Sequence, residues 1–249
     1  RAALLTGKYP VHIGMHHNVI ESTSPWGLRL DETLFPEYVA ELGYKSYIVG
    51  KWHLGHFNEA YLPTRRGFDS FFGFYGNCIG YFSHVSELGA CVAPDCFYDL
   101  RDDDVPVLDR VGEHTTYVLN SEMVRVVRSH KEADPESTTP MFLYYPVANV
   151  HNPILVPDGM LDQTTGGLGA CLEGIENYPR REYAALTYML DETIANMTSV
   201  LQETGMYENS IIVVASDNGA NPIQQNTTTP GGSGSNFPLR GMKGYLFDG

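Results

Sequence analysis

The sequence predicts an α/β domain in which a mostly parallel central sheet is flanked by helices. Three apolar runs have the length and composition of buried strands, at residues 44–50, 140–148 and 209–216. Segments with helical periodicity lie at residues 31–43, 114–131 and 180–204. Strands that alternate with helices are typical of a parallel sheet covered on its faces. A chain of 249 residues is long enough for one such domain.

The first helix and the strand after it have recognisable ends. Leu34, Tyr38 and Leu42 fall on one face of the helix at 31–43, and Gly43 suits its C-terminal cap. Gly50 is expected to end the following strand.

Residues 56–112 are rich in Gly, Phe and Tyr and are expected to form an irregular, site-forming insertion. The next helix has its apolar positions at Leu119, Met123, Val126, Val127 and His130. The last helix is expected to bury a stripe made of Leu186, Leu190, Ile194, Met197 and Leu201. Residues 219–238 read as a loop rich in Gly, Ser, Thr, Asn and Pro.

Composition and charge limit the class of partner. The net charge of −14 argues against a nucleic-acid partner, which requires clustered Lys and Arg. A small anionic ligand remains compatible, because it needs only a local positive pocket. No apolar run approaches the roughly 18–20 residues of a membrane span. The chain opens within an apparent helix, "RAALLTG", and is expected to be a fragment of a longer protein.

Cysteines and glycosylation sequons favour a secretory route. Cys91 and Cys96 bracket the turn-like "VAPD", so a local disulfide is plausible, and Cys78 with Cys171 would form a second pair. The N-x-T sequons are at Asn196 and Asn226. These features together favour an extracellular or lysosomal location.

Polar side chains follow each predicted strand. Lys51 and His53 follow the first, His151 the second, and Asp217 with Asn218 the third. Because ligand sites form at the carboxyl ends of parallel strands, we expect these residues to converge. Asp217 and Asn218 offer the oxygen ligands that Ca²⁺ or Mg²⁺ prefers. Separately, each motif also has a simpler interpretation, as a solvated turn with a packed histidine or as an Asx turn.

Lys243, in "PLRGMKGYLFDG", adds a further cation, although a lone lysine in such a loop can simply be solvated. Two lysines, two histidines, an arginine and metal-type oxygens suit a doubly charged tetrahedral oxyanion. The sequence has neither a G-x-x-x-x-G-K-[ST] loop nor a G-x-S-x-G elbow. The absence of both motifs argues against a kinase-like or a serine-hydrolase function.

Several motifs give the chain a resemblance to the type I sulfatases of the alkaline phosphatase superfamily, and among them to arylsulfatase B-like enzymes. "RAALLTGKYP" resembles the end of the first sulfatase signature, and "GYKSYIVGKWHLG" resembles the second. The segments "LPTRRGFDSFFGF", "YFSH", "NVHNPILVP", "ASDNGA" and "PLRGMKGYLFDG" follow in the family's order. The resemblance covers nearly the whole chain and implies an alkaline phosphatase/sulfatase-like fold that is incomplete at both ends.

The resemblance implies that residues 1–249 are the N-terminal catalytic domain without its nucleophile and without the C-terminal subdomain. The family nucleophile is a formylglycine that a formylglycine-generating enzyme makes from a Cys upstream of Arg1. Arg1 matches the arginine that holds it. One Ca²⁺ ion is implied, with an aspartate pair upstream and with Asp217 and Asn218 as the remaining ligands. We therefore expect residues 1–249 alone not to hydrolyse 4-methylumbelliferyl sulfate.

The resemblance also assigns roles to the basic side chains. Lys51 and Lys243 match lysines that bind sulfate. His151 matches the histidine that faces the ester oxygen and protonates the leaving group. His53 matches the histidine that takes a proton from the formylglycine hydrate when sulfate is expelled.

The chain departs from the family pattern near the substrate. "HNP" at 151–153 replaces the more usual His-Glu-Pro, and "GNCIGY" at 76–81 replaces a more acidic segment. His84 matches a histidine near the sugar-facing wall, and both a substrate contact and simple packing stay open. A structural or surface role is expected for the other histidines, His12, His16, His17, His56, His114 and His130.

The implied function is hydrolysis of a sulfate ester, either a sulfated sugar of a glycosaminoglycan or an aryl sulfate. One alternative is a sulfatase-like protein that binds sulfated glycans without cutting them. The other is a phosphatase or phosphodiesterase of the same superfamily. Those enzymes use Ser or Thr with two zinc ions, a pattern that the lone "SDNG" with Lys51 and Lys243 fits less well.

Overall fold

A computed structural model describes residues 1–17, 19–86, 97–162, 167–221 and 234–248. The chain divides into two compact units, each of which is described by itself. The first unit comprises Arg1–Ala148 and Ala195–Glu208. The second comprises Asn149–Ile194 and Asn209–Gly249.

The first unit is built on a five-stranded sheet with the order β4-β3-β2-β1-β5. The strands are β1 (Lys45–Lys51), β2 (Ser70–Phe74), β3 (Arg101–Asp102), β4 (Val105–Pro106) and β5 (Met141–Tyr144). The three longer strands, β1, β2 and β5, pair in parallel, while β3 and β4 form an antiparallel edge. The predicted fold class, a mostly parallel sheet flanked by helices, is confirmed.

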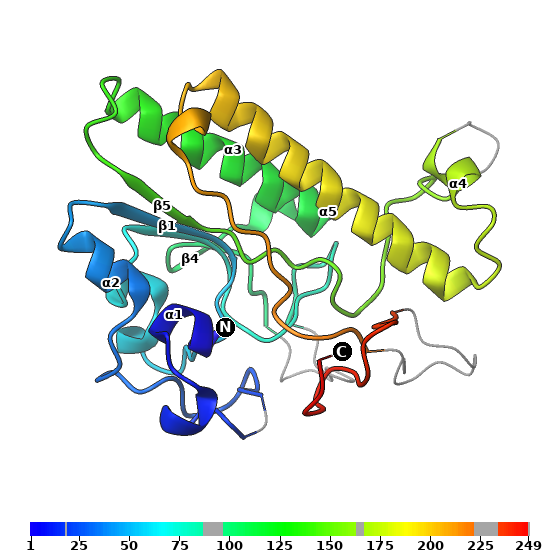
Figure 1. The fold of residues 1–249 in the computed structure, drawn as a ribbon, viewed down its shortest axis with the longest axis horizontal. Helices are drawn as coiled ribbons and strands as arrows, with labels where there is room; N and C mark the ends of the chain where they lie inside the picture. The colour runs from blue at the N-terminus through cyan, green and yellow to red at the C-terminus, as the bar shows by residue number, and fades with distance from the viewer. Residues whose placement is uncertain (18, 87–96, 163–166, 222–233, 249) are drawn as a thin grey trace. The chain divides into compact units, whose positions relative to one another are not determined.

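Helices cover both faces of this sheet. The first unit contains α1 (Ala2–Thr6), α2 (Phe35–Ala40) and α3 (Thr115–Ala133). Both α2 and α3 contact β1, and they lie on opposite faces of the sheet (Figure 1). The predicted apolar stripe of α3 is confirmed, since Leu119, Met123 and Val127 are buried. His130 on α3 is a packed histidine, with Nδ1 3.1 Å from the Tyr47 hydroxyl.

The buried core of the first unit anchors the chain just after β1. Trp52 is fully buried and packs edge-on against Phe68. Its indole N–H donates to the carbonyls of Gly55 and Tyr61, both at 3.0 Å. Because Trp52 is fixed in this way, the backbone of its neighbours Lys51 and His53 is held in place.

Two glycines allow the ends of β1 and β2 to approach closely. A Cβ on Gly73 would lie 1.9 Å from the Gly50 carbonyl oxygen, and one on Gly50 would lie 2.2 Å from the Pro146 carbonyl oxygen. Gly50 also has a φ of 127°, which side chains rarely tolerate. The prediction that Gly50 ends the strand was therefore wrong by one residue. β1 continues to Lys51, and Gly50 serves the close packing of its neighbours.

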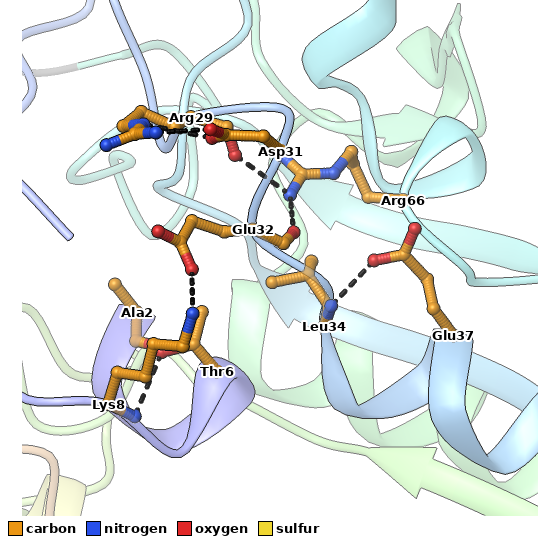
Figure 2. A network of polar contacts seen from close by, with 9 residues as sticks. All are labelled: Ala2, Thr6, Lys8, Arg29, Asp31, Glu32, Leu34, Glu37 and Arg66. Atoms are coloured by element: carbon orange, nitrogen blue, oxygen red, sulfur yellow. Dashed lines mark hydrogen bonds and ion pairs between the residues drawn. The ribbon is translucent and has the colours of Figure 1, made fainter.

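A buried arginine joins the loop before α2 to the rest of the first unit. The Arg66 guanidinium donates to the backbone carbonyls of Leu28 at 3.4 Å, Arg29 at 3.3 Å and Glu32 at 2.8 Å. The Glu32 carboxylate in turn pairs with Lys8 Nζ at 2.6 Å (Figure 2). Lys8 follows α1 directly, so this network helps to fix the helix that begins next to Arg1.

Two other expectations for the first unit need correction. The insertion at 56–112 is not irregular throughout, because it contains the buried strand β2, "SFFGF", and the short edge strands β3 and β4. A run of five residues, three of them phenylalanine, was too short a pattern to distinguish from a loop. The predicted helix at 31–43 is shortened to α2, Phe35–Ala40, because Leu34 is extended at the N-cap and Pro36 lies in the first turn, where a helix tolerates proline.

The second unit contains α4 (Leu168–Cys171) and most of α5 (Tyr178–Glu203), which continues into the first unit. The predicted stripe of α5 is confirmed in part: Leu186 and Leu201 are buried, while Leu190, Ile194 and Met197 are half-buried. Single-turn 3₁₀ helices lie at Pro10–His12, Glu59–Tyr61, Pro63–Arg65, Leu108–Arg110 and Tyr207–Asn209. Within the described ranges, no helix combines the length and apolarity needed to cross a membrane.

The predicted strand at 209–216 is not formed. Residues 211–215 have no strand assignment, and Ile211 and Val213 are 94% and 81% exposed. An apolar run becomes a strand only when a neighbouring strand satisfies its backbone groups, and the described part of the second unit offers none.

Candidate functional site

Arg1 and Lys51 meet at the carboxyl ends of β1 and β5. Arg1 Nη1 donates to the Lys51 carbonyl at 3.3 Å and lies 3.4 Å from the Tyr144 hydroxyl. The Lys51 backbone N–H donates to the Pro146 carbonyl at 2.8 Å, which ties the two strand ends together. The Lys51 residue is buried to 8% exposure. The structure thus brings together two of the predicted anion-binding residues.

His53 occupies an unusual backbone position beside Lys51. Its φ is 57°, in the left-handed region that only a few per cent of non-glycine residues adopt. Its backbone N–H donates to the Tyr75 carbonyl at 3.0 Å, and its ring Nε2 lies 2.9 Å from the Ile20 carbonyl. A carbonyl only accepts hydrogen bonds, so Nε2 carries a proton and Nδ1 is the basic nitrogen of the neutral ring. This suits a proton acceptor.

His84 is packed inside the first unit. It is 0% exposed, and its Nδ1 lies 3.3 Å from the Tyr98 hydroxyl. Burial lowers the pKa of the imidazole, which favours the neutral ring. His84 is packed in this structure, and its contact with the substrate stays a prediction.

A buried carboxylate that the sequence did not point to lies at the carboxyl end of β2. Asp99 is 0% exposed and accepts the backbone N–H of Tyr75 at 3.1 Å and that of Gly76 at 2.8 Å. Burial raises the pKa of Asp99 to about 6, against the opposing effect of these two hydrogen bonds. In the sequence Asp99 lies just before the acidic run 102–104, and nothing in the local pattern distinguishes Asp99 from those neighbouring aspartates.

Asp99 should make stability depend on pH in an unusual direction. Its folded-state pKa lies above the ordinary value, so the folded protein holds this proton more tightly than the unfolded chain. The contribution of Asp99 to the free energy of unfolding therefore rises as the pH falls from about 6 to about 4, by up to about 1.4 kcal/mol per pH unit. Urea unfolding of wild type and Asp99→Asn across this range measures it. A difference between them that stays constant with pH would contradict the expectation.

In the second unit, Asp217 and Asn218 form a compact exposed pair. The Asn218 side-chain amide donates to Asp217 Oδ1, and the Ser216 hydroxyl donates to the Asn218 carbonyl at 2.6 Å. With the amide nitrogen engaged as a donor, carboxylate and amide oxygens remain as acceptors, which is the donor type that Ca²⁺ prefers. Among the residues that the structure describes, no group of three or more His, Cys, Asp or Glu could hold a metal. Further ligands would therefore have to come from water or from elsewhere.

Asn236, which the sequence analysis did not single out, joins the loop after Asn218 to the segment that carries Lys243. Its side chain accepts the Ala220 N–H at 2.7 Å and donates to the Ala220 carbonyl at 2.9 Å. The Lys243 N–H donates to the same carbonyl at 3.1 Å. These bonds place the exposed Lys243 on a segment that is fixed next to residues 217–220.

His151 is exposed in the second unit. Its Nδ1 lies 2.8 Å from the Asn152 carbonyl, so Nδ1 carries a proton. Nε2 is then the nitrogen that gains or loses a proton when the ring titrates.

The predicted modification sites have different outcomes. Asn196 is exposed on α5, as a glycosylation acceptor requires. Asn226, Cys91 and Cys96 lie outside the described residues. Cys78 lies in the first unit and the exposed Cys171 in the second, and their pairing stays a prediction. Of the remaining histidines, His12, His16 and His17 are exposed, and His56 and His114 are packed.

The first unit defines a class of site: basic and proton-carrying side chains at the carboxyl edge of a parallel sheet, where anionic ligands bind in α/β proteins. The chain belongs to the sulfatase family, since the profile of the family described as Sulfatase matches residues 1–247.

Curated relatives and solved structures agree with this membership. Over the whole chain, mouse (Mus musculus) arylsulfatase J is 38% identical and human (Homo sapiens) arylsulfatase A is 29% identical. The chain covers 38% and 46% of their respective lengths. The crystal structure of Ps i-CgsB in complex with k-i-k-neocarrahexaose is 26% identical with a TM-score of 0.80, over 100% of this chain and 52% of that one. The chain therefore spans less than half of these curated relatives.

Proposed function

We propose that the protein containing this chain hydrolyses sulfate esters. The observation that carries the proposal is the family match over residues 1–247, which spans every basic residue of the candidate site. The position of Arg1 at the strand ends, where its guanidinium donates to the Lys51 main-chain carbonyl, supports it, because a sulfate group needs positive charge nearby.

The proposed function gives each basic side chain a role. Lys51 and Lys243 neutralise the charge of the sulfate group. His151 donates a proton to the departing ester oxygen, and His53 accepts a proton at Nδ1 when sulfate is released. Arg1 orients the group that attacks sulfur.

Two groups that the chain does not contain complete this site. Formylglycine, made from a Cys upstream of Arg1 by a formylglycine-generating enzyme, would supply the attacking hydroxyl. One Ca²⁺ ion, with Asp217 and Asn218 among its ligands, would polarise the sulfate group.

The substrate is proposed to be a sulfated sugar of a glycosaminoglycan or an aryl sulfate. The names of two relatives support this class: N-acetylgalactosamine-6-sulfatase of mouse, 28% identical over 100% of this chain, and arylsulfatase J. The structure of Ps i-CgsB with a bound carrahexaose supports a sugar as the ligand. The paired sequons and cysteines favour a lysosomal or extracellular location.

The test compares turnover of 4-methylumbelliferyl sulfate and 4-methylumbelliferyl phosphate by the full-length protein. We expect the sulfate to be hydrolysed with a kcat/KM at least about a hundredfold above that of the phosphate. Preference for the phosphate would assign the protein to the phosphatase alternative. Tight binding of a sulfated glycan without turnover of any sulfate ester would assign it to the binding-protein alternative.

A further inference from the structure

We propose that Asp99 is a positioning residue that sets His53 for turnover by fixing the backbone that follows β2. The inference rests on the proposed function of His53. It adds a residue that touches neither ligand nor His53 itself.

In the first step, the Asp99 side chain fixes the backbone that follows β2 through two hydrogen bonds. One carboxylate oxygen accepts the Tyr75 N–H and the other accepts the Gly76 N–H, at 3.1 and 2.8 Å. Arg101 Nε lies farther from Asp99, at 3.7 Å. Both oxygens are thus committed to successive backbone amides in a buried setting, where a hydrogen bond to a charged group contributes most.

The second step is the transfer of this constraint to the chain after β1. The pairing of β1 with β2 ends at Lys51 and Phe74, but backbone hydrogen bonds continue beyond it. The Trp52 N–H donates to the Phe74 carbonyl at 2.9 Å, and the His53 N–H donates to the Tyr75 carbonyl at 3.0 Å. Tyr75 is therefore held by Asp99 through its N–H and holds His53 through its carbonyl.

The third step is the strain at His53. A non-glycine residue at a φ of 57° costs about 1 kcal/mol or more and persists only where its surroundings impose it. Two of the anchors of His53 are its N–H bond to Tyr75 and its ring contact with Ile20. Loosening Tyr75 removes the first anchor, and the backbone of His53 can then relax and turn the imidazole.

Gly76 gives an independent way to disturb the same contact. A Cβ at this position would lie 2.9 Å from Asp99 Oδ2 and 3.2 Å from Ser22 Oγ. Gly76 does not have a left-handed φ, so Gly76→Ala strains no backbone torsion and acts by displacing the carboxylate.

Asp103 offers a matched control at the other end of the same strand. Its Oδ1 accepts the Phe71 N–H at 2.8 Å, which is the same kind of bond as those of Asp99. Asp103→Asn keeps an oxygen for this bond but removes the negative charge of the acceptor, at the start of β2 and away from His53.

The experiment uses the full-length protein with Asp99→Asn, Gly76→Ala and Asp103→Asn. In Asp99→Asn an amide NH₂ has to face one of two backbone N–H groups, so one bond is lost. We expect kcat for a sulfate ester to fall about tenfold to a hundredfold, with KM changed less than about threefold, because misplacing a catalytic group affects turnover. Gly76→Ala should likewise lower kcat and leave KM nearly unchanged. Asp103→Asn should keep kcat within about twofold.

Hydrogen exchange, measured by peptide-resolved mass spectrometry, is the second readout and does not depend on activity. The peptide that contains His53 should exchange at least about tenfold faster in Asp99→Asn and should be unchanged in Asp103→Asn. Equal kcat losses in the two variants, or unchanged protection at His53 in Asp99→Asn, would overturn the inference. If wild type hydrolyses no sulfate ester, the proposed function fails, and the exchange data still decide whether Asp99 positions His53.

Discussion

Replacing Arg66 with methionine is expected to lower the free energy of unfolding by about 3 to 6 kcal/mol. From a buried position, the Arg66 guanidinium donates to the carbonyl of Leu28. It also donates to the carbonyls of Arg29 and Glu32 (Figure 2). Each buried carbonyl that loses its partner costs about 1–3 kcal/mol. Methionine preserves most of the volume, so the loss reports the hydrogen bonds. Urea unfolding followed by circular dichroism measures it.

Arg29→Met is the matched control. Arg29 lies in the same network, but its side chain is 61% exposed and pairs with the equally exposed Asp31 (Figure 2). Surface pairs of this kind contribute at most about 1 kcal/mol. A similar loss in both variants would show that Arg66 is no more important than a surface cation.

Replacing Lys51 with methionine is expected to lower kcat/KM of the full-length protein for a sulfate ester by about a hundredfold to a thousandfold. Lys51 is buried at the carboxyl end of β1 beside Arg1, where few water molecules can substitute for its charge. Removing one preorganised electrostatic partner of a reacting oxyanion costs an enzyme about this much. Steady-state kinetics with 4-methylumbelliferyl sulfate measures the change.

Lys45 provides the control for Lys51 at the opposite end of the same strand. Its side chain is 54% exposed and pairs with Asp69 at 2.6 Å. We expect Lys45→Met to keep kcat/KM within about twofold. If Lys51→Met also keeps its activity, Lys51 does not bind the sulfate group.

The sequence predicted the elements whose patterns are long or strongly periodic. The apolar run before Lys51 and the buried stripe of α3 are both confirmed. They could be predicted because burial in a sheet or on one face of a helix repeats apolar residues over many positions, so that one exception does not hide the pattern. The strand-end rule pointed to Lys51, and the family motifs added Arg1, which the structure places next to the Lys51 carbonyl.

Other features depend on contacts that no local pattern records. Residues 211–215 have the composition of a strand, but composition does not supply the neighbour with which a strand must pair. Asp99 was missed because its importance comes from two backbone amides more than twenty residues earlier in the chain. The shortness of β2 hid a central strand within an apparent insertion.

The close approach of β1 and β2 restricts how this site can change during evolution. Any side chain at Gly73 would place its Cβ 1.9 Å from the Gly50 carbonyl oxygen, so neither strand can be reshaped there by ordinary substitution. Substitution at Gly50 or Gly73 is therefore not a route by which the backbone that carries Lys51 can change. Binding of new ligands would have to evolve through changes in the loops that follow the strands. Insertions and substitutions in those loops leave the paired ends of β1 and β2 unchanged.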